Sequence, residues 1–472
     1  MLGEAMSQTA VRSPAIFPDG LATELAALLG DRFSTSAAVR DHHSRDESYH
    51  APEAPGAVVY PQSTEEVQRI VAACARHRTP LISFGAGTSL EGHVMAHRGG
   101  VCLDTTRMNR VLRVSPEDMD ATVEAGITRK QLNHALRDSG LCFFIDPGAD
   151  ATIGGMTATR ASGTTAVRYG TMKDNVLGLT VVLADGRVIR TGGRARKSSA
   201  GYDLTRLFVG SEGTLGVITE ITLRLHLVPE ATSAAVCSFA TMKGAVDTAA
   251  AVIQSGIPVA RVELLDEAMV DAVNHFSGLA HKVAPTLFFE FHGVSERSVV
   301  EQAQMAEAAA RENGGTGFEW ATRAEDRARL WKARHDAYYA ALALRPGSKG
   351  WTTDVCVPIS RLTEAVLAAK EDLAASPLKG ALVGHAGDGN FHMIYLVDPA
   401  RVEEIEEARR LADLLVVRAL EVGGTCTGEH GIGMGKMGYL EREHGEAVDV
   451  MRDLKHALDP LNLMNPGKML RA

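Results

Sequence analysis

The chain of 472 residues contains no apolar run of 18 or more residues, which excludes a transmembrane helix of ordinary length. Its net charge of −9 lacks the basic excess of a nucleic-acid-binding protein. The six cysteines form no C-x-x-C pair, which favours reduced thiols. Residues 1–7 show no basic segment followed by an apolar one, so we expect no secretory signal. These absences predict a cytoplasmic protein, with peripheral attachment to the inner membrane as the alternative.

The rest of the composition is that of an ordinary globular protein, with 45% hydrophobic residues and a mean hydropathy of −0.03. The length allows two or three domains. Many of the 46 glycines gather in a few clusters, and near Pro229 the character changes to amphipathic helices alternating with strands. We therefore expect an α+β protein divided into a helical segment (1–50), a glycine-rich domain (51–229), an α+β domain with antiparallel sheet (230–450) and a tail (451–472).

Two histidines enclose a short segment rich in glycine and aspartate, from Gly384 to His392. Each of its glycines would cost a helix about 1 kcal/mol, and strand-like residues flank it, so we predict a β-hairpin with its loop over 386–391. The imidazoles of His385 and His392 could then reach one divalent ion, with Glu429 as the third ligand. Zinc and manganese both suit two imidazoles and a carboxylate. The alternative is that both histidines are merely solvated.

The glycine clusters of the first half differ from the common nucleotide-binding motifs. The stretch Gly85–Gly92 follows a strand and could bring backbone N–H groups to an anion. It is neither a Rossmann fingerprint, because Leu90 replaces a glycine, nor a Walker A loop. A plain tight turn explains it equally well. The small residues of 145–155 and 161–163 suit a chain that lies against a large flat ligand, with an irregular surface loop as the alternative.

Several stretches together resemble the vanillyl-alcohol-oxidase (PCMH-type) flavoproteins over about residues 50–470. In the first half these are 84–92, 146–150, 153–155, 161–164 and 209–218; in the second they are 384–392, 425–431 and 465–468. The stretch 338–358 is similar to that of the cytochrome-type D-lactate dehydrogenases, to which D-2-hydroxyglutarate and glycolate dehydrogenases are related. The resemblance implies a two-part PCMH-type FAD-binding domain, then a substrate and metal domain, and a tail that packs back on the FAD domain.

The resemblance implies FAD as the cofactor. The pyrophosphate loop has Ala86, Thr88 and Ser89 where covalent relatives carry a histidine, so we expect non-covalent flavin. The implied cofactor contacts are Gly85, Ala86, Gly87, Thr88, Ser89, Gly92, Pro147, Gly148, Ala149, Thr152, Gly154, Gly155, Ser162, Gly163, Tyr169, Glu212, Gly216, Ile218 and Asn465.

The resemblance also implies oxidation of a small D-2-hydroxy acid such as D-lactate by hydride transfer to FAD. His430 is the expected general base, with a hydrogen-bonding role as the alternative. Arg334 matches the family's carboxylate clamp, although the residue alone would suit a helix surface. Lys349 and Asn390 fit further substrate contacts, and the bulky Tyr338 favours a small or apolar substrate tail over a second carboxylate.

Other functions and partners stay open at this stage. D-2-hydroxyglutarate or glycolate dehydrogenase is the nearest alternative, followed by a non-redox flavin transferase and a metal-dependent hydrolase. The hydrolase would leave the glycine clusters without a purpose. We expect the electron acceptor to be a cytochrome, a quinone or an electron-transfer flavoprotein, and we regard a homodimer as compatible with the sequence.

Overall fold

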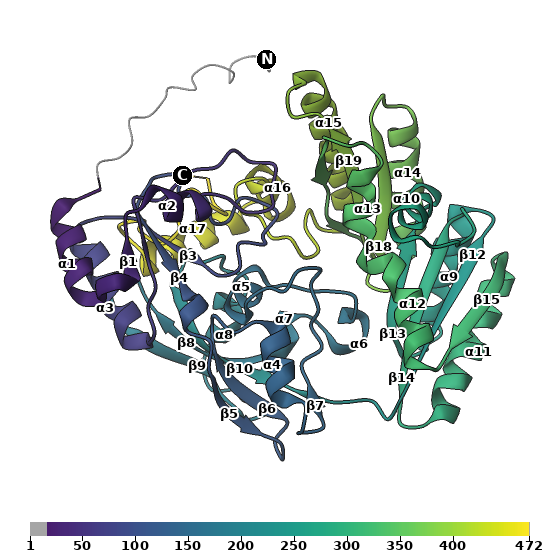
Figure 1. The fold of residues 1–472 in the computed structure, drawn as a ribbon, viewed down its shortest axis with the longest axis horizontal. Coiled ribbons are helices and arrows are strands. Elements are labelled where there is room, and N and C mark those ends of the chain that lie inside the picture. The colour runs from purple at the N-terminus through teal and green to yellow at the C-terminus, as the bar shows by residue number, and fades with distance from the viewer. Residues whose placement is uncertain (1–16, 472) are drawn as a thin grey trace.

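The computed structural model describes residues 17–471, which fold as two bodies joined near residue 229 (Figure 1). The first sixteen residues of the predicted N-terminal segment lie outside the described residues. The expectation of no secretory signal concerns these residues. Among the described residues no helix is long and apolar enough to cross a membrane. The predicted α+β class is confirmed.

The first body contains two larger sheets. The strands β1 to β4 form a four-stranded sheet in the order β1-β2-β4-β3, and β5, β6 and β8 to β10 form a five-stranded sheet in the order β5-β6-β10-β8-β9. The strands are β1 (Phe33–Ser34), β2 (Ala57–Val59), β3 (Leu81–Phe84), β4 (Val101–Asp104), β5 (Val111–Ser115), β6 (Asp120–Glu124), β7 (Leu141–Cys142), β8 (Val176–Val182), β9 (Val188–Gly192), β10 (Val217–Arg224) and β11 (His226–Leu227). Each sheet has its own apolar core, in keeping with the two-part domain that the sequence predicts.

Among the described residues the first body also contains eight helices. They are α1 (Asp19–Leu29), α2 (Ala37–His42), α3 (Thr64–Arg76), α4 (Arg129–Leu136), α5 (Ile153–Thr159), α6 (Ala166–Tyr169), α7 (Met172–Asn175) and α8 (Leu204–Phe208). Helix α5 lies within residues 145–163, where the sequence predicted a chain without regular secondary structure. It begins at Thr152, whose hydroxyl accepts a hydrogen bond from Gly155 N at 3.2 Å and so satisfies one of the free N–H groups of the first turn.

The second body is built on an eight-stranded antiparallel sheet with the order β15-β12-β14-β13-β18-β19-β16, in which β17 also pairs with β19. Its strands are β12 (Ala231–Phe239), β13 (Val259–Leu265), β14 (Thr286–Gly293), β15 (Gly315–Ala321), β16 (Lys349–Thr352), β17 (Val355–Cys356), β18 (Lys379–His385) and β19 (Asn390–Val397). The helices of the second half are α9 (Met242–Gln254), α10 (Glu267–Ser277), α11 (Glu296–Glu312), α12 (Ala324–His335), α13 (Ala337–Ala343), α14 (Leu362–Ala374), α15 (Val402–Glu421), α16 (Met437–His444) and α17 (Ala447–Leu458).

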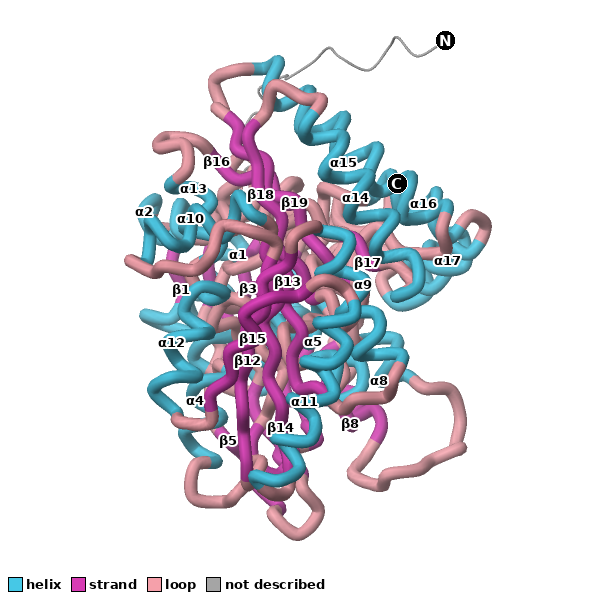
Figure 2. Tube along the Cα trace, turned by 90° about the vertical axis from the view of Figure 1, so that its right-hand side faces the viewer, coloured by secondary structure: helices cyan, strands magenta, loops and turns pink. Residues whose placement is uncertain are grey.

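Helices cover both faces of this sheet, which Figure 2 shows nearly edge-on. Helices α9, α11, α14 and α15 pack on one face, and α10, α12 and α13 pack on the other. Because side chains alternate along a strand, residues 381, 383 and 385 of β18 and residues 392, 394 and 396 of β19 point to the second face. His385 and His392 therefore lie on the same side of the sheet as α12, which carries Arg334.

The chain returns to the first body at its C-terminal end. Helices α16 and α17 (yellow in Figure 1) lie beside the first four-stranded sheet, and Leu81 N donates to Leu463 O at 2.8 Å. Met464 is buried in the core of that sheet. The return places the segment after α15 between the two bodies, which brings its residues to both of them.

Candidate active site

The predicted hairpin is confirmed: β18 and β19 are adjacent antiparallel strands joined by residues 386–389, a loop shorter than expected. His385 lies opposite Asn390 and His392 opposite Val383, so the two histidines are diagonal neighbours on one face. Their ring centroids are 5.5 Å apart and the rings are nearly perpendicular, at 87°. Both side chains are buried.

Glu429 reaches both histidines from the loop after α15. Its Oε1 lies 3.3 Å from Nε2 of His385 and 3.3 Å from Nε2 of His392. Two ligands about 2.1 Å from a tetrahedral ion are about 3.4 Å apart, so these residues fit a divalent cation. Burial opposes ionisation of Glu429, but the two imidazoles outweigh it and hold the pKa of this carboxyl well below its usual value. The candidate ligands are thus close together and one of them is anionic.

Hydrogen bonds on the far side of each imidazole fix its orientation. His385 Nδ1 lies 2.8 Å from Glu263 Oε1, and His392 Nδ1 lies 3.0 Å from the carbonyl oxygen of Thr353. Both partners accept, so each Nδ1 carries a proton, and with a cation in place each Nε2 would turn its lone pair to the space beside Glu429. This is the arrangement that histidine metal ligands commonly show.

Asp354 holds the loop that carries Glu429. Its Oδ2 accepts the backbone N–H groups of Glu429 and His430, each at 2.9 Å, and the hydroxyl of Thr427 at 2.7 Å. Burial alone would raise the pKa of Asp354, yet neighbouring cationic and N–H groups hold it well below its usual value. A buried carboxylate of Asp354 therefore sets the position of the third candidate ligand.

His430 lies in the same cluster. Its ring stacks on that of His392, with centroids 5.0 Å apart and planes at 7°. Its buried Nδ1 has no hydrogen-bond partner among the described residues, and Glu91 Oε1 lies 4.0 Å from it. Burial lowers the pKa of His430 to about 4, below the ordinary value on which its assignment as base was argued. The imidazole is therefore in its neutral, proton-accepting form at pH 7, and the lowered pKa makes it a weaker base than a free histidine.

Arg334 is linked to the cluster through one carboxylate. Its Nε donates to Glu263 Oε2 at 2.5 Å, and the other oxygen of Glu263 binds His385. Asn390 is also adjacent, but its amide nitrogen donates to Asp354 Oδ1 and to Val355 O, both at 2.7 Å. The structure thus brings Arg334 and Asn390 to the candidate ligands, with the amide N–H groups of Asn390 already engaged.

The remaining two predicted substrate contacts lie elsewhere. Lys349 is exposed and pairs with Val397, which is about 16 Å along β19 from His392 at the usual rise per residue. The structure does not bring Lys349 to the cluster. Tyr338 is partly buried among the apolar side chains of α10 and α13, one turn after Arg334.

The predicted cofactor contacts lie on segments that converge in the first body. Gly85 to Gly92 follow β3, and Pro147 to Thr152 precede α5. Gly154 and Gly155 lie in the first turn of α5, and Ser162 and Gly163 follow this helix. Tyr169 ends α6, Glu212 and Gly216 precede β10, and Ile218 lies in β10. A side chain at Gly85 would bring its Cβ within 2.2 Å of Thr152 Oγ1, so only glycine allows these segments to approach.

Asn465 gives a direct test of whether this region fits a flavin. Its amide nitrogen donates to His93 O at 3.1 Å and to Glu212 O at 2.8 Å. Its Oδ1 is buried and has no partner among residues 17–471. An unpaired buried carbonyl costs about 1–3 kcal/mol, and the N–H of a flavin ring would supply the missing donor. The residues present therefore fit FAD.

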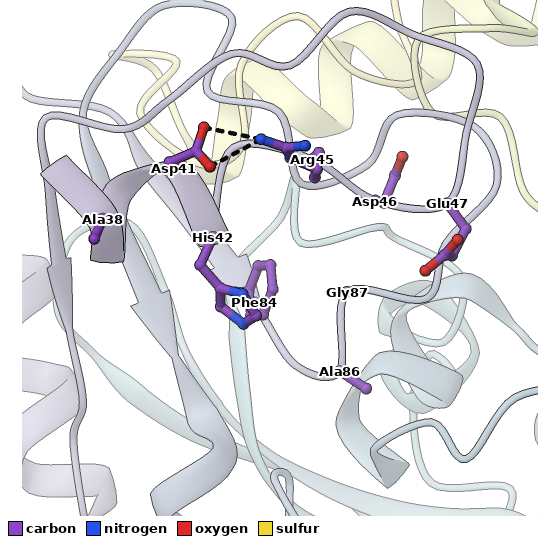
Figure 3. A pocket seen from close by; sticks show the side chains of 9 residues that line it. All are labelled: Ala38, Asp41, His42, Arg45, Asp46, Glu47, Phe84, Ala86 and Gly87. Atoms are coloured by element: carbon purple, nitrogen blue, oxygen red, sulfur yellow. Dashed lines mark hydrogen bonds and ion pairs between the residues drawn. The ribbon is translucent and has the colours of Figure 1, made fainter.

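A cavity of about 600 Å³ lies beside the same glycine loop. Figure 3 shows that Phe84, Ala86 and Gly87 face Arg45, Asp46 and Glu47 across it, and its other lining residues are Ala38, Asp41 and His42. Glu47 N donates to Ser89 O at 3.0 Å, which ties the two walls together. None of the candidate metal ligands lines this cavity.

Comparison with known proteins decides the family. Residues 55–192 match the FAD binding domain family, and residues 228–469 match the C-terminal domain of FAD linked oxidases. The chain belongs to the FAD-linked oxidase family. This FAD-linked oxidase is 54% identical to a probable mitochondrial D-lactate dehydrogenase of Danio rerio, over 93% of this chain and 88% of that protein. It is 49% identical to a mitochondrial D-lactate dehydrogenase [cytochrome] of Arabidopsis thaliana, over 96% of this chain and 80% of that protein.

The fold of this FAD-linked oxidase is similar to that of p-cresol methylhydroxylase, with a TM-score of 0.77, 19% identity and coverage of 95% of this chain and 96% of that chain. The predicted resemblance to PCMH-type flavoproteins is thereby confirmed. The chain is an FAD-dependent oxidoreductase, and the hydrolase alternative fails because residues 55–192 form an FAD-binding domain.

Sequence reasoning missed three buried charged residues around the site: Glu263, Asp354 and Lys436. Lys436 Nζ lies 3.1 Å from Glu91 Oε1 and 3.6 Å from Asp354 Oδ2. A signal existed for Glu263, because Val259–Leu265 is an apolar strand interrupted only by Arg261 and Glu263. A charge within such a strand indicates a buried, paired group.

Proposed function

We propose that this FAD-linked oxidase oxidises D-lactate and similar small D-2-hydroxy acids to the 2-keto acids. The observation that carries the proposal is the cluster of His385, His392 and Glu429, with Glu429 Oε1 3.3 Å from each histidine and Arg334 joined to it through Glu263. Two relatives at 54% and 49% identity are named D-lactate dehydrogenases, which supports this choice of acid.

The cluster would hold one divalent cation, zinc or manganese, which supplies a positive charge that lowers the pKa of a bound hydroxyl. Two neutral imidazoles and one carboxylate leave such an ion with net positive charge. The orientation of both Nε2 atoms toward Glu429 is already set by Glu263 and by the carbonyl of Thr353, so the chain pays little entropy to organise the ligands.

FAD, when bound, takes the hydride from C2 of the acid. The chain's own contribution is to hold the acid and to move its hydroxyl proton. Arg334 would bind the carboxylate through its terminal nitrogens, because its Nε is occupied by Glu263. Neutral His430 would accept the hydroxyl proton, and the carboxylates of Asp354 and Glu91 lie near enough to stabilise the resulting cation. His385, His392 and Asp354 are buried, which limits the access of water to this part of the site.

A panel of D- and L-2-hydroxy acids of rising chain length, coupled to an artificial electron acceptor, tests the proposed substrate. We expect D-lactate to be turned over fastest and its L-isomer poorly. Turnover of D-2-hydroxyglutarate well above that of D-lactate would contradict the argument from Tyr338. Glycolate as the preferred acid would instead favour a glycolate dehydrogenase.

The flavin in this proposal is non-covalent, because Ala86, Thr88 and Ser89 occupy the loop in which covalent relatives carry a histidine. Acid precipitation should leave the yellow colour in the supernatant, and colour in the pellet would overturn this point. The acceptor that we favour is a cytochrome, in line with the name of the Arabidopsis relative. A quinone or an electron-transfer flavoprotein would compete with it in a reoxidation assay.

A further inference from the structure

Glu263 is a fully buried carboxylate in the middle of the second body. It lies on β13 directly opposite His385 of β18, and its exposed fraction is 0%. Residues paired in this way have their Cβ atoms about 5 Å apart, so contact between the two side chains follows from the register of the sheet. Arg334 reaches the same carboxylate from α12, which covers this face.

Each oxygen of Glu263 has a different partner. Oε1 lies 2.8 Å from His385 Nδ1, and Oε2 accepts from Arg334 Nε at 2.5 Å. One carboxylate therefore contacts both a candidate metal ligand and the candidate carboxylate clamp. An uncompensated buried charge is costly, and the guanidinium of Arg334 supplies the compensation.

We propose that Glu263 is a positioning residue that sets the tautomer of His385 and the direction of Arg334 together. The inference rests on the proposed function, since it concerns the residues that would hold the cation and the substrate carboxylate. Acceptance at Oε1 keeps the proton on His385 Nδ1 and frees Nε2 for the ion. Acceptance at Oε2 fixes Arg334 through Nε and leaves its two terminal nitrogens as the pair that a carboxylate binds.

The substitution Glu263→Gln separates this role from simple packing. Glutamine has nearly the same shape but one carbonyl oxygen and one donor group, so it cannot accept from both His385 and Arg334. We expect divalent-metal affinity to fall about 10- to 100-fold. We also expect the Kd for D-lactate, taken from the concentration dependence of anaerobic flavin reduction in metal-saturated protein, to rise about tenfold.

Glu290→Gln is the matched control. Glu290 is also a buried glutamate of the same sheet, on β14, and its Oε1 lies 2.9 Å from Nε2 of His292. This substitution removes the charge from a buried glutamate–histidine pair that does not touch the candidate metal ligands. We expect E290Q to lower the thermal midpoint to a similar extent as E263Q while metal affinity and the Kd for D-lactate stay at wild-type values.

The proposal has two arms, the action of Glu263 on the metal through His385 and its action on the substrate through Arg334. A double-mutant cycle with Arg334→Met tests the second. If Glu263 acts on the substrate through Arg334, E263Q raises the Kd for D-lactate in the wild-type background and not in the R334M background. Additive effects in the cycle would overturn this arm. Should E263Q fail to accumulate as folded protein, Glu263→Asp decides instead, because it keeps the charge but is one methylene shorter and cannot keep both contacts.

The outcomes separate the inference from the function on which it rests. Wild-type metal affinity and wild-type Kd in E263Q would refute the inference alone. A wild-type protein that oxidises D-lactate without a divalent metal would refute the metal part of the proposed function, and the cycle with R334M would then decide the remaining arm. Equal losses of metal in E263Q and E290Q would show that Glu263 has only a structural role.

Discussion

At the scale of the residue, His430 departs from its ordinary chemistry. Burial lowers its pKa to about 4, and its Nδ1 is buried without a partner among the described residues. A neutral imidazole in this position can accept a proton, and general base catalysis of this kind contributes about 10²- to 10⁴-fold to a rate.

His430→Asn should therefore slow the reduction of the flavin by D-lactate about 10²-fold or more, because asparagine cannot accept the hydroxyl proton. Stopped-flow reduction under anaerobic conditions measures this rate directly. The metal content of the variant should equal that of the wild type, since His430 is not among the proposed ligands. Reduction at the wild-type rate would remove His430 from the role of base.

Single residues also show what the sequence could and could not reveal. His385, His392 and Glu429 carry recognisable ligand chemistry, and the glycines between the histidines indicated a hairpin. The role of Glu263 depends on a partner 122 positions away, and that of Asp354 on one 75 positions away, so no local pattern identifies these partners. Lys349 was assigned through the resemblance alone, and the register of β16 places it far from the cluster.

At the scale of the element, the loop of residues 427–433 depends on acceptors outside itself. Asp354 accepts two of its N–H groups, and Glu212 accepts those of Ile432 at 2.7 Å and Gly433 at 2.8 Å. One carboxylate comes from the second body and the other from the first. The loop that carries Glu429 and His430 is therefore fixed from both sides.

Asp354→Asn should weaken metal retention several-fold, because the amide would replace one acceptor oxygen by a donor next to the N–H groups of Glu429 and His430. The metal-to-protein ratio after desalting measures this effect. Glu443→Gln is a suitable control, since Glu443 accepts Cys426 N at 2.8 Å, directly before this loop and away from Glu429. Equal metal retention in D354N and wild type would contradict the proposed anchoring.

The hairpin of the second body followed from its glycines and the strand-like residues that flank them, and the amphipathic helices expected after Pro229 followed from apolar periodicity. Helix α5 did not, because its glycines at 154 and 155 oppose a helix in isolation. Close packing within the first body stabilises this helix, because a Cβ at Gly154 would lie 2.6 Å from Ala125 Cβ. Packing of this kind between distant segments is absent from any local pattern.

At the scale of the whole molecule, the C-terminal tail joins the two bodies. Asn465 bonds to backbone carbonyls of His93 and Glu212, and Lys468 Nζ donates to Met95 O at 2.7 Å. The tail thus closes the region that the sequence assigned to the flavin.

Asn465→Ala should weaken FAD retention about tenfold, because it removes two hydrogen bonds to the first body and the buried acceptor that fits the flavin ring. Fluorescence of released flavin after gel filtration gives the retained fraction. Asn462→Gly is the matched control, since Asn462 is only partly buried in the same tail and has a φ of 49° that glycine adopts freely. Equal retention in N465A and wild type would separate Asn465 from the flavin.

The account depends most on convergence of the two bodies on one substrate, and metal removal tests this directly. Purified protein is freed of divalent metal with a chelator while its flavin is retained, and anaerobic bleaching of the flavin by D-lactate is then followed. We predict that bleaching slows by orders of magnitude and recovers when zinc or manganese is restored. Flavin reduction at the undiminished rate in metal-free protein would contradict the account.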